Sequence, residues 1–241
     1  MQTSQLIENQ LPPNESISPE LLTLLDSLGA SRNVDQNTCL FREGMEANEI
    51  HLIKSGLVQV HKLTADGKEL SMRICRAGDI VGELTLFSEH ATYFLTAKMI
   101  TAGEVVAIDK GLLEKELMED ARLTLEFMKW TSNHMRKFQT KIRDLMLNGK
   151  KGALYSTLIR LSNSYGRKRS DGILIDIAFT NQELAMFCAA TRESVNRMLA
   201  ELRKRDKISI QPSGKILIKD LQFLRDEIGC ENCPIELCNI N

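Results

Sequence analysis

Short apolar runs separated by glycine turns fill the chain from about residue 37 to residue 109. Turn pairs recur there, for example Ser55-Gly56 and Ala102-Gly103. The run LSMRIC, residues 70–75, alternates with a period of two and so directs its side chains to the two faces of a strand. Many short strands with regular glycine turns predict an antiparallel double-sheet roll, the double-stranded β-helix or jelly roll.

A helical pattern replaces the strand pattern from about residue 112 to residue 147, where turn residues are absent. Met128, Met135 and Ile142 recur at every seventh position. This heptad pattern predicts a two-stranded coiled coil between identical chains, whereas the alternative is a helix packed on its own domain. Gly149-Lys-Lys-Gly152 interrupts the helix and predicts a hinge and domain boundary. The interleaved seam of the heptads consists of Thr131, Phe138 and Leu145.

Residues 180–219 predict two short helices followed by a wing. Thr180 and Glu183 form a capping-box pattern at the start of the first helix. The alanines at 189–190 suit a tight turn, and Thr191 can cap the second helix. A two-stranded wing is then predicted by the strings ISI (208–210), QPSG (211–214) and KILI (215–218). This order of elements is typical of a winged helix-turn-helix.

The second of these helices carries polar residues close to its N-terminus, where a helix-turn-helix meets the major groove. Arginine can donate two parallel hydrogen bonds to guanine, and glutamate can accept from the amino group of cytosine. Arg192 and Arg197 are therefore candidate guanine readers, and Glu193 is a candidate cytosine reader. The alternative is an amphipathic helix with a solvated charged face. The candidate DNA-binding set also includes Asn196, Thr180 and Thr191, and Lys204, Arg205 and Lys215 are candidate phosphate contacts.

Charge and composition limit the other possibilities. The chain of 241 residues has a formal net charge of −1, so a basic DNA footprint must be local. Residues 191–205 provide one, with five basic residues against two acidic ones. We expect a cytoplasmic protein, because neither a signal-peptide pattern nor a bilayer-spanning apolar stretch is present. Phosphate-cradling loops, nucleophile–base signatures and metal–histidine motifs are absent too, so we expect no enzyme.

Three of the six cysteines lie in the last dozen residues, with the spacing Cys230-x2-Cys233-x4-Cys238. Soft thiolates select zinc, Cu(I) or iron–sulfur clusters. Three thiols are one ligand short of a closed site, so the spacing leaves an iron–sulfur cluster, a zinc site or a redox thiol pair open. The other cysteines, which we expect to be buried as small apolar residues, are Cys39, Cys75 and Cys188.

From about residue 20 to residue 219, the chain resembles the CRP/FNR family of bacterial transcription regulators. The specific stretches are GDIVGELTLF (78–87) and TNQELAMFCAATRESVNRML (180–199). The resemblance implies an α+β fold, a homodimer on palindromic double-stranded DNA, and contact with RNA polymerase. Family members with an Arg-Glu-x-x-x-Arg recognition helix read TGTGA half-sites, and this chain has the same set at residues 192–197.

The chain departs from the nucleotide-binding members of this family. Those members follow the GEL stretch with an Arg-Ser or Arg-Thr pair that grips the cyclic phosphate, but the corresponding stretch here, EHATYFLTA, has no arginine. Glu83 could still bind a ribose hydroxyl. We therefore expect no response to cyclic AMP.

The tail is similar to that of the Bacillus-type FNR proteins, which carry a C-x2-C-x4-C motif after the wing. That resemblance implies an oxygen sensor with one [4Fe–4S] cluster per subunit, held by Cys230, Cys233, Cys238 and an aspartate. The matching aspartate is Asp144, in KIRDLML, and Asp226 is its rival because it precedes Cys230 by one helical turn. A CRP/FNR-type regulator with a structural zinc site in the tail is the alternative.

We thus expect five segments. They are a mobile arm (1–17), a β-roll sensor-like domain (18–111), a coiled-coil dimerisation helix (112–148), a winged helix-turn-helix domain (149–220) and a cluster-binding tail (221–241). Without oxygen, the cluster should tie the tail to the long helix near the hinge and orient the recognition helices. After cluster loss the tail should detach, leaving a dimer that binds DNA poorly.

Overall fold

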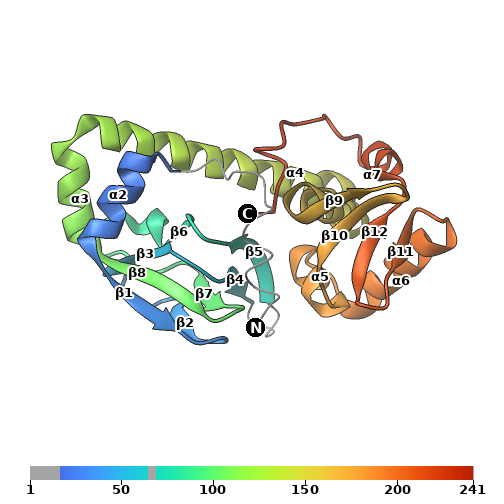
Figure 1. Ribbon diagram of the computed structural model, residues 1–241, viewed down its shortest axis with the longest axis horizontal. Coiled ribbons are helices and arrows are strands. Elements are labelled where there is room, and N and C mark those ends of the chain that lie inside the picture. The colour runs from blue at the N-terminus through green and yellow to red at the C-terminus, as the bar shows by residue number, and fades with distance from the viewer. Residues whose placement is uncertain (1–16, 65–68, 241) are drawn as a thin grey trace. The chain divides into compact units, whose positions relative to one another are not determined.

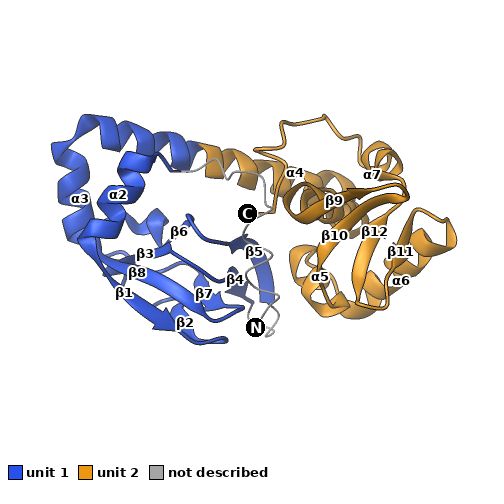
Figure 2. Cartoon of the chain, viewed as in Figure 1, with its two compact units in different colours: residues 1–132, 241 blue, residues 133–240 orange. Residues whose placement is uncertain are grey.

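The computed structural model describes residues 17–64 and 69–240, which divide into two compact units. The first unit runs to Ser132 and the second covers Asn133–Ile240 (Figure 2). Most of the predicted mobile arm lies outside the described residues. Ile17, the first described residue, is buried and belongs to the core of the first unit. No helix within the described residues is long and apolar enough to cross a membrane.

The first unit is a roll of two four-stranded antiparallel sheets, as the glycine-turn pattern predicts (Figure 1). One sheet has the order β1-β8-β3-β6, with bounds Gly29–Val34, Gly103–Asp109, Glu49–Ile53 and Ile80–Val81. The other has the order β2-β7-β4-β5, with bounds Cys39–Phe41, Thr96–Met99, Val58–Leu63 and Glu69–Cys75. A short 3₁₀ turn, η1 (Glu83–Thr85), follows β6.

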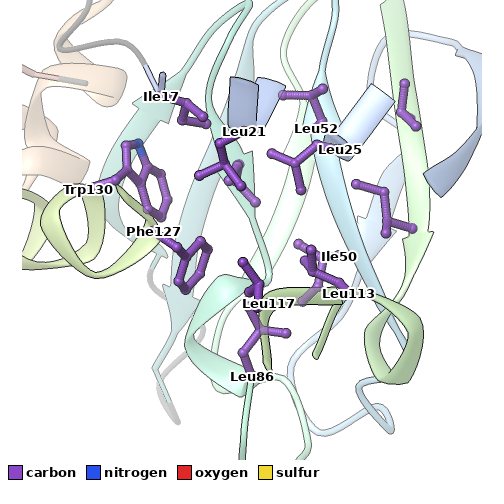
Figure 3. Packing of buried hydrophobic residues seen from close by; sticks show 13 residues of the cluster. Ile17, Leu21, Leu25, Ile50, Leu52, Leu86, Leu113, Leu117, Phe127 and Trp130 are labelled. Atoms are coloured by element: carbon purple, nitrogen blue, oxygen red, sulfur yellow. The ribbon is translucent and has the colours of Figure 1, made fainter. Parts of the chain in front are cut away.

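Helices cover the β1-β8-β3-β6 sheet. Helix α2 (Pro19–Leu28) starts at a capped N-terminus, because the Leu21 amide donates to the Ser18 hydroxyl and proline occupies the first turn. Leucines of α2 and of α3 (Lys110–Glu119) pack with Phe127 and Trp130 from the start of α4 (Ala121–Tyr165), as Figure 3 shows. This apolar cluster joins the helices to the sheet.

The predicted helix from residue 112 is divided at Asp120. This residue has extended backbone angles (φ −119°, ψ 101°), and its carboxylate accepts the amide of Arg122 at 2.8 Å. Aspartate is a favoured N-cap, so Asp120 ends α3 and starts α4. The prediction of one continuous helix is therefore wrong at this position.

A second break lies where the sequence predicts a hinge. Gly149 has φ 57° and ψ −158°, which is not helical. Beyond it the chain folds back, because Ser156 donates to Asp144 at 2.5 Å and Arg160 donates to Thr140 at 3.0 Å. Residues 140 and 160 would be about 30 Å apart in a straight helix. The two halves of α4 thus form an antiparallel helical hairpin.

The second unit adds a four-stranded antiparallel sheet of order β11-β12-β10-β9. The segment GRKRSDG (166–172) forms β9 and its turn, and residues Gly166 to Arg169 pair with β10. The strand bounds are Ile208–Ile210, Lys215–Ile218, Gly172–Ala178 and Gly166–Arg169, in sheet order. The helices are α5 (Asn181–Phe187), α6 (Arg192–Lys204) and α7 (Leu221–Glu227).

Candidate DNA-reading face and tail site

The capping box predicted for α5 is present. The Glu183 amide donates to the Thr180 hydroxyl at 3.2 Å, and the Thr180 amide donates to the Glu183 carboxylate at 2.7 Å. Both bonds satisfy amides that a helix N-terminus otherwise leaves unpaired. Thr180 is therefore a structural cap at the entrance to the helix-turn-helix.

The turn between α5 and α6 is tight. Ala189 takes a left-handed conformation (φ 47°), and the Ala190 amide donates to the Ala185 carbonyl at 3.1 Å. Thr191 then caps α6 by accepting the Ser194 amide at 3.2 Å. Small side chains are suited to this turn because a bulky residue with positive φ would be strained.

Helix α6 buries one face and exposes the other. Val195, Leu199 and Leu202 are buried. The four polar residues on the opposite face, Arg192, Glu193, Asn196 and Arg197, are exposed. This is the arrangement by which a recognition helix presents side chains to base edges.

Two of these side chains have further partners within the protein. Hydrogen bonds from its own amide and from Thr191 lower the pKa of the Glu193 carboxyl, and Arg192 lowers it too. Glu193 is thus a carboxylate that can only accept hydrogen bonds, as a cytosine reader must. Asn196 accepts a bond from the Asn181 side chain at 3.2 Å, which joins α6 to α5.

The three candidate phosphate contacts differ in their surroundings. Lys204 is exposed at the end of α6. Arg205 lies over the ring of Phe223 at 4.5 Å, and Lys215 pairs with Asp176 at 2.7 Å. Because the latter two already have partners, Lys204 is the one best placed to bind a phosphate.

The C-terminal tail is held against α4 by apolar and polar contacts. Leu237 and Ile240 are buried. The Asn163 amide group donates to the Cys238 carbonyl at 2.6 Å, and the Ile240 amide donates to Ser164 at 3.0 Å. The tail is therefore docked by contacts that involve no metal, which differs from the expected tail attached by its cluster alone.

Asp144 lies at the centre of this contact region and is 5% exposed. Its Oδ2 atom accepts from Ser156 at 2.5 Å and from Arg160 at 3.1 Å, and its Oδ1 atom accepts from Arg143 at 2.8 Å. Asp226, the rival ligand, is exposed and accepts from Gln222 at 2.8 Å. Of the two carboxylates, Asp144 is the one buried beside the tail.

The three tail cysteines are half-buried. Burial raises the pKa of the Cys238 thiol, Cys230, Cys233 and Asp144 raise it further, and Arg160 opposes this shift. Cys230, Cys233 and Asp144 are thus close enough to Cys238 to influence its thiol electrostatically.

The donor set consists of three thiols and one carboxylate. Within residues 17–64 and 69–240, no three histidine, cysteine, aspartate or glutamate side chains converge closely enough to bind one metal ion. An iron–sulfur cluster is held mainly by thiolates. Three soft thiols within nine residues, beside a buried carboxylate, suit that requirement chemically.

Two arginines in this site escaped the sequence analysis. Arg160 is 3% exposed and also donates to the Leu237 carbonyl at 3.1 Å. Arg143 pairs with Glu231 in the tail. A charged residue within the apolar run Leu158-Ile159-Arg160-Leu161 was an available signal, because a buried arginine needs a partner.

Two family models match the chain. One is described as a cyclic nucleotide-binding domain and matches residues 31–120. The other is described as a Crp-like helix-turn-helix domain and matches residues 152–227. An anaerobic regulatory protein of Bacillus subtilis (strain 168) is 61% identical over 231 residues, which cover 95% of this chain and 97% of that protein.

Solved structures agree with this fold. The c-di-GMP responsive global regulator CLP of Xanthomonas campestris has a TM-score of 0.73 at 22% identity, covering 83% of this chain and 98% of that chain. FixK2 of Bradyrhizobium japonicum has a TM-score of 0.68 at 17% identity, and the match covers 82% of this chain and 96% of that chain. At these identities the likeness establishes the architecture alone.

Proposed function

The chain belongs to the CRP/FNR family of transcription regulators, and from that premise we propose that it controls transcription under anaerobic conditions through an oxygen-labile [4Fe–4S] cluster. As a member of a family of regulators, it is not an enzyme. The observation that carries the proposal is the group of three tail cysteines beside buried Asp144. The 61% identical relative, whose name describes an anaerobic regulator, supports it.

We propose that the DNA target is a palindrome of TGTGA-like half-sites. Arg192 and Arg197 would donate to guanines, and ionised Glu193 would accept from a cytosine amino group. Thr191 and Thr180 lie at helix N-termini and are candidates for phosphate contact. Contact with RNA polymerase is expected for a regulator of this family.

The homodimer would form through α4. Met128, Met135 and Ile142 are 62%, 53% and 47% exposed in the single chain. Large apolar side chains exposed at heptad spacing favour pairing with a second helix over packing within the chain. Two identical recognition helices could then read two half-sites one helical turn apart.

Cys230, Cys233, Cys238 and Asp144 are the proposed ligands of the cluster, one cluster per subunit. When bound, the cluster would supply a tie between the tail and α4 that oxygen destroys. A carboxylate is a harder ligand than a thiolate, so the iron at Asp144 would be held less firmly. That lability suits a sensor.

The docked tail changes how we expect the switch to work. Leu237 and Ile240 keep their apolar contacts without the cluster. Loss of the cluster would therefore free residues 230–236, not the whole tail. Asp144 contacts Ser156 and Arg160 across the Gly149 break, so a change of its partners would alter the helical hairpin that precedes the DNA-binding elements.

The test is anaerobic purification followed by iron and sulfide analysis, a visible spectrum, gel shift and sedimentation. We expect a brown protein that binds DNA, and an air-treated protein that remains dimeric but binds poorly. Asp144→Asn should lower the iron and sulfide content, whereas the matched Asp226→Asn should not. Full DNA affinity of the apo protein would contradict the switch, and a colourless protein containing zinc would favour the structural zinc site.

A further inference from the structure

Asn196 lies in the middle of the polar face of α6. It is exposed, it follows Arg192 by four residues and Glu193 by three, and it directly precedes Arg197, so it shares one face of the helix with the first two. Its amide has two ends of opposite character, an oxygen that accepts hydrogen bonds and an NH₂ group that donates them. The end that faces a base decides which base is read.

Asn181 of α5 engages one of these two ends. Its Nδ2 atom donates to Oδ1 of Asn196 at 3.2 Å. The oxygen of Asn196 is thus paired within the protein, and the bond fixes the plane of the amide group. Its NH₂ group cannot pair with this second donor and keeps its hydrogens for an acceptor.

The donor comes from a rigid part of the unit. Asn181 is half-buried and is the first residue of α5, directly after the capping box of Thr180 and Glu183. Helices α5 and α6 contact each other, and Leu184 and Val195 are fully buried. Asparagine has a short side chain, so little conformational entropy is lost when two of them pair between packed helices.

This pairing changes what Asn196 can read. An asparagine reads adenine with both ends at once, because its NH₂ group donates to N7 while its oxygen accepts from the N6 amino group. Asn181 competes for that oxygen. The NH₂ group by itself suits thymine O4 or guanine O6, whereas cytosine presents only its amino donor in the major groove.

We propose that Asn181 is a positioning residue that sets the base preference of Asn196. By pairing with the oxygen it directs the NH₂ group towards DNA, and Asn196 then prefers the keto bases thymine and guanine over adenine and cytosine. The inference rests on the proposed function of α6 as the DNA-reading helix. Keto bases predominate in the proposed TGTGA half-site, and Asn181 itself touches no base.

The experiment uses the full-length protein, prepared without oxygen, and palindromic duplexes in which each base pair of the half-site is varied in turn. Fluorescence anisotropy gives an affinity for each duplex. Asn196→Ala first identifies the base pair that Asn196 reads, because this variant loses the base preference there. At that position the unaltered protein should favour thymine or guanine by roughly 3–10-fold, the discrimination that one hydrogen bond provides.

Asn181→Asp is the decisive variant, because it keeps the shape of the side chain and removes its donor. A carboxylate at this position would accept from the NH₂ group of Asn196, which turns the amide round and presents its oxygen to DNA. The preference should then move to a base with an amino group, cytosine or adenine. The added negative charge weakens binding to all sequences alike, so the base preference remains the readout.

Asn181→Ala is the second variant, and it frees the oxygen of Asn196 without replacing its partner. The preference should shift towards adenine by roughly 3–10-fold. In an Asn196→Ala background, neither Asn181 variant should alter any base preference. Gln182→Ala is the control, because it removes the exposed neighbour in the same helix turn and should leave the preference unchanged. Melting curves identify any variant that fails to fold.

An unchanged base preference in both Asn181 variants would overturn the proposal, as would an equal shift in the Asn196→Ala background. Uniformly weaker binding of Asn181→Ala with a reduced salt dependence would also overturn it, because Asn181 would then be a phosphate contact.

The proposed function of α6 fails on different grounds. If Arg192→Ala and Arg197→Ala leave the sequence specificity unchanged, α6 is not the reading helix. If those variants lose specificity while Asn196→Ala keeps the base preference at every position, only the inference about Asn181 is wrong. A base preference is a ratio of affinities, so neither result depends on the iron–sulfur assignment.

Discussion

Arg73 donates to both carboxylate oxygens of Glu83, at 3.0 Å each, in the buried interior of the roll. The same guanidinium donates to the Ile80 carbonyl at 2.9 Å. Burial by itself would lower the pKa of Arg73, but Cys75, Glu83 and Asp79 raise it overall. Glu83, the residue that could have bound a ribose hydroxyl, thus already has an internal partner.

Cyclic AMP should therefore fail to bind. A ribose hydroxyl would have to displace a buried bidentate ion pair, and the stretch EHATYFLTA offers no arginine for the phosphate. Calorimetry of the full-length protein should show no heat of binding with cyclic AMP at millimolar concentration. Tight binding with one nucleotide per subunit would contradict this prediction.

Breaking the Arg73–Glu83 pair should destabilise the roll. Arg73→Met leaves a buried carboxylate without a partner, for which about 3–5 kcal/mol of unfolding free energy is the expected loss. The double variant Arg73→Met/Glu83→Leu removes both charges and should recover most of that loss. Urea denaturation of the single and double variants measures both. A single variant as stable as the unaltered protein would show that the pair contributes nothing.

The roll should also lose stability in mild acid through His51. The pKa of His51 is lowered to about 4, mainly by burial. Glu49 opposes this shift, and Arg32 adds to it. The unfolded histidine titrates near 6.5, so the unfolded chain binds the proton preferentially between these values. Stability should fall by about 3 kcal/mol as the pH drops from about 6.5 to about 4.

His51→Gln tests this directly, because it removes the titrating group and should flatten that part of the profile. His90→Asn is the control. His90 is exposed with φ 49°, a conformation that asparagine tolerates. Urea denaturation at several pH values gives the profiles, and an equally steep loss in His51→Gln would assign the acid sensitivity to other groups.

Gly152→Ala should disturb the helical hairpin. An added Cβ would lie 1.9 Å from the Cβ of Asn148, whose side chain donates to the Ile228 carbonyl at 3.3 Å. Since neither Cβ can move without its backbone, we expect a loss of about 1–3 kcal/mol and weaker DNA binding. Gly111→Ala in α3 is the control, because its Cβ makes only an ordinary contact and should be neutral or stabilising.

Substitutions in the recognition helix should cause two kinds of defect in DNA binding. Arg192→Ala or Arg197→Ala should cost about 1–3 kcal/mol at a TGTGA-like palindrome and relax specificity at the contacted base. Lys204→Ala should weaken binding to all sequences alike. It should also reduce by about 1 the slope of the logarithm of affinity against the logarithm of salt concentration. Fluorescence anisotropy over a range of salt separates these effects, and Lys215→Ala should have less influence because Lys215 pairs with Asp176.

Features that depend on residues close together in the chain could be predicted from the sequence. The predicted Thr180–Glu183 capping box and Gly149 break are both present. Each depends on hydrogen bonds or dihedral angles within one helical turn, where residue type alone is decisive. The break at Asp120 was missed because residues 112–147 contain neither glycine nor proline, although aspartate is itself a cap signal.

The residue spacing and composition alone determined the cysteine motif, the basic recognition helix and the strand pattern of the roll, since all of these are local properties. Only the tertiary structure decided that Arg73 fills the interior of the roll, that Asp144 is buried beside the tail while Asp226 is exposed, and that Arg160 joins both halves of α4 to Leu237. The residues joined by those contacts are 10 to 77 positions apart in the sequence. They arise where the chain reverses, and a buried charge must then pair with whatever group the fold brings to it.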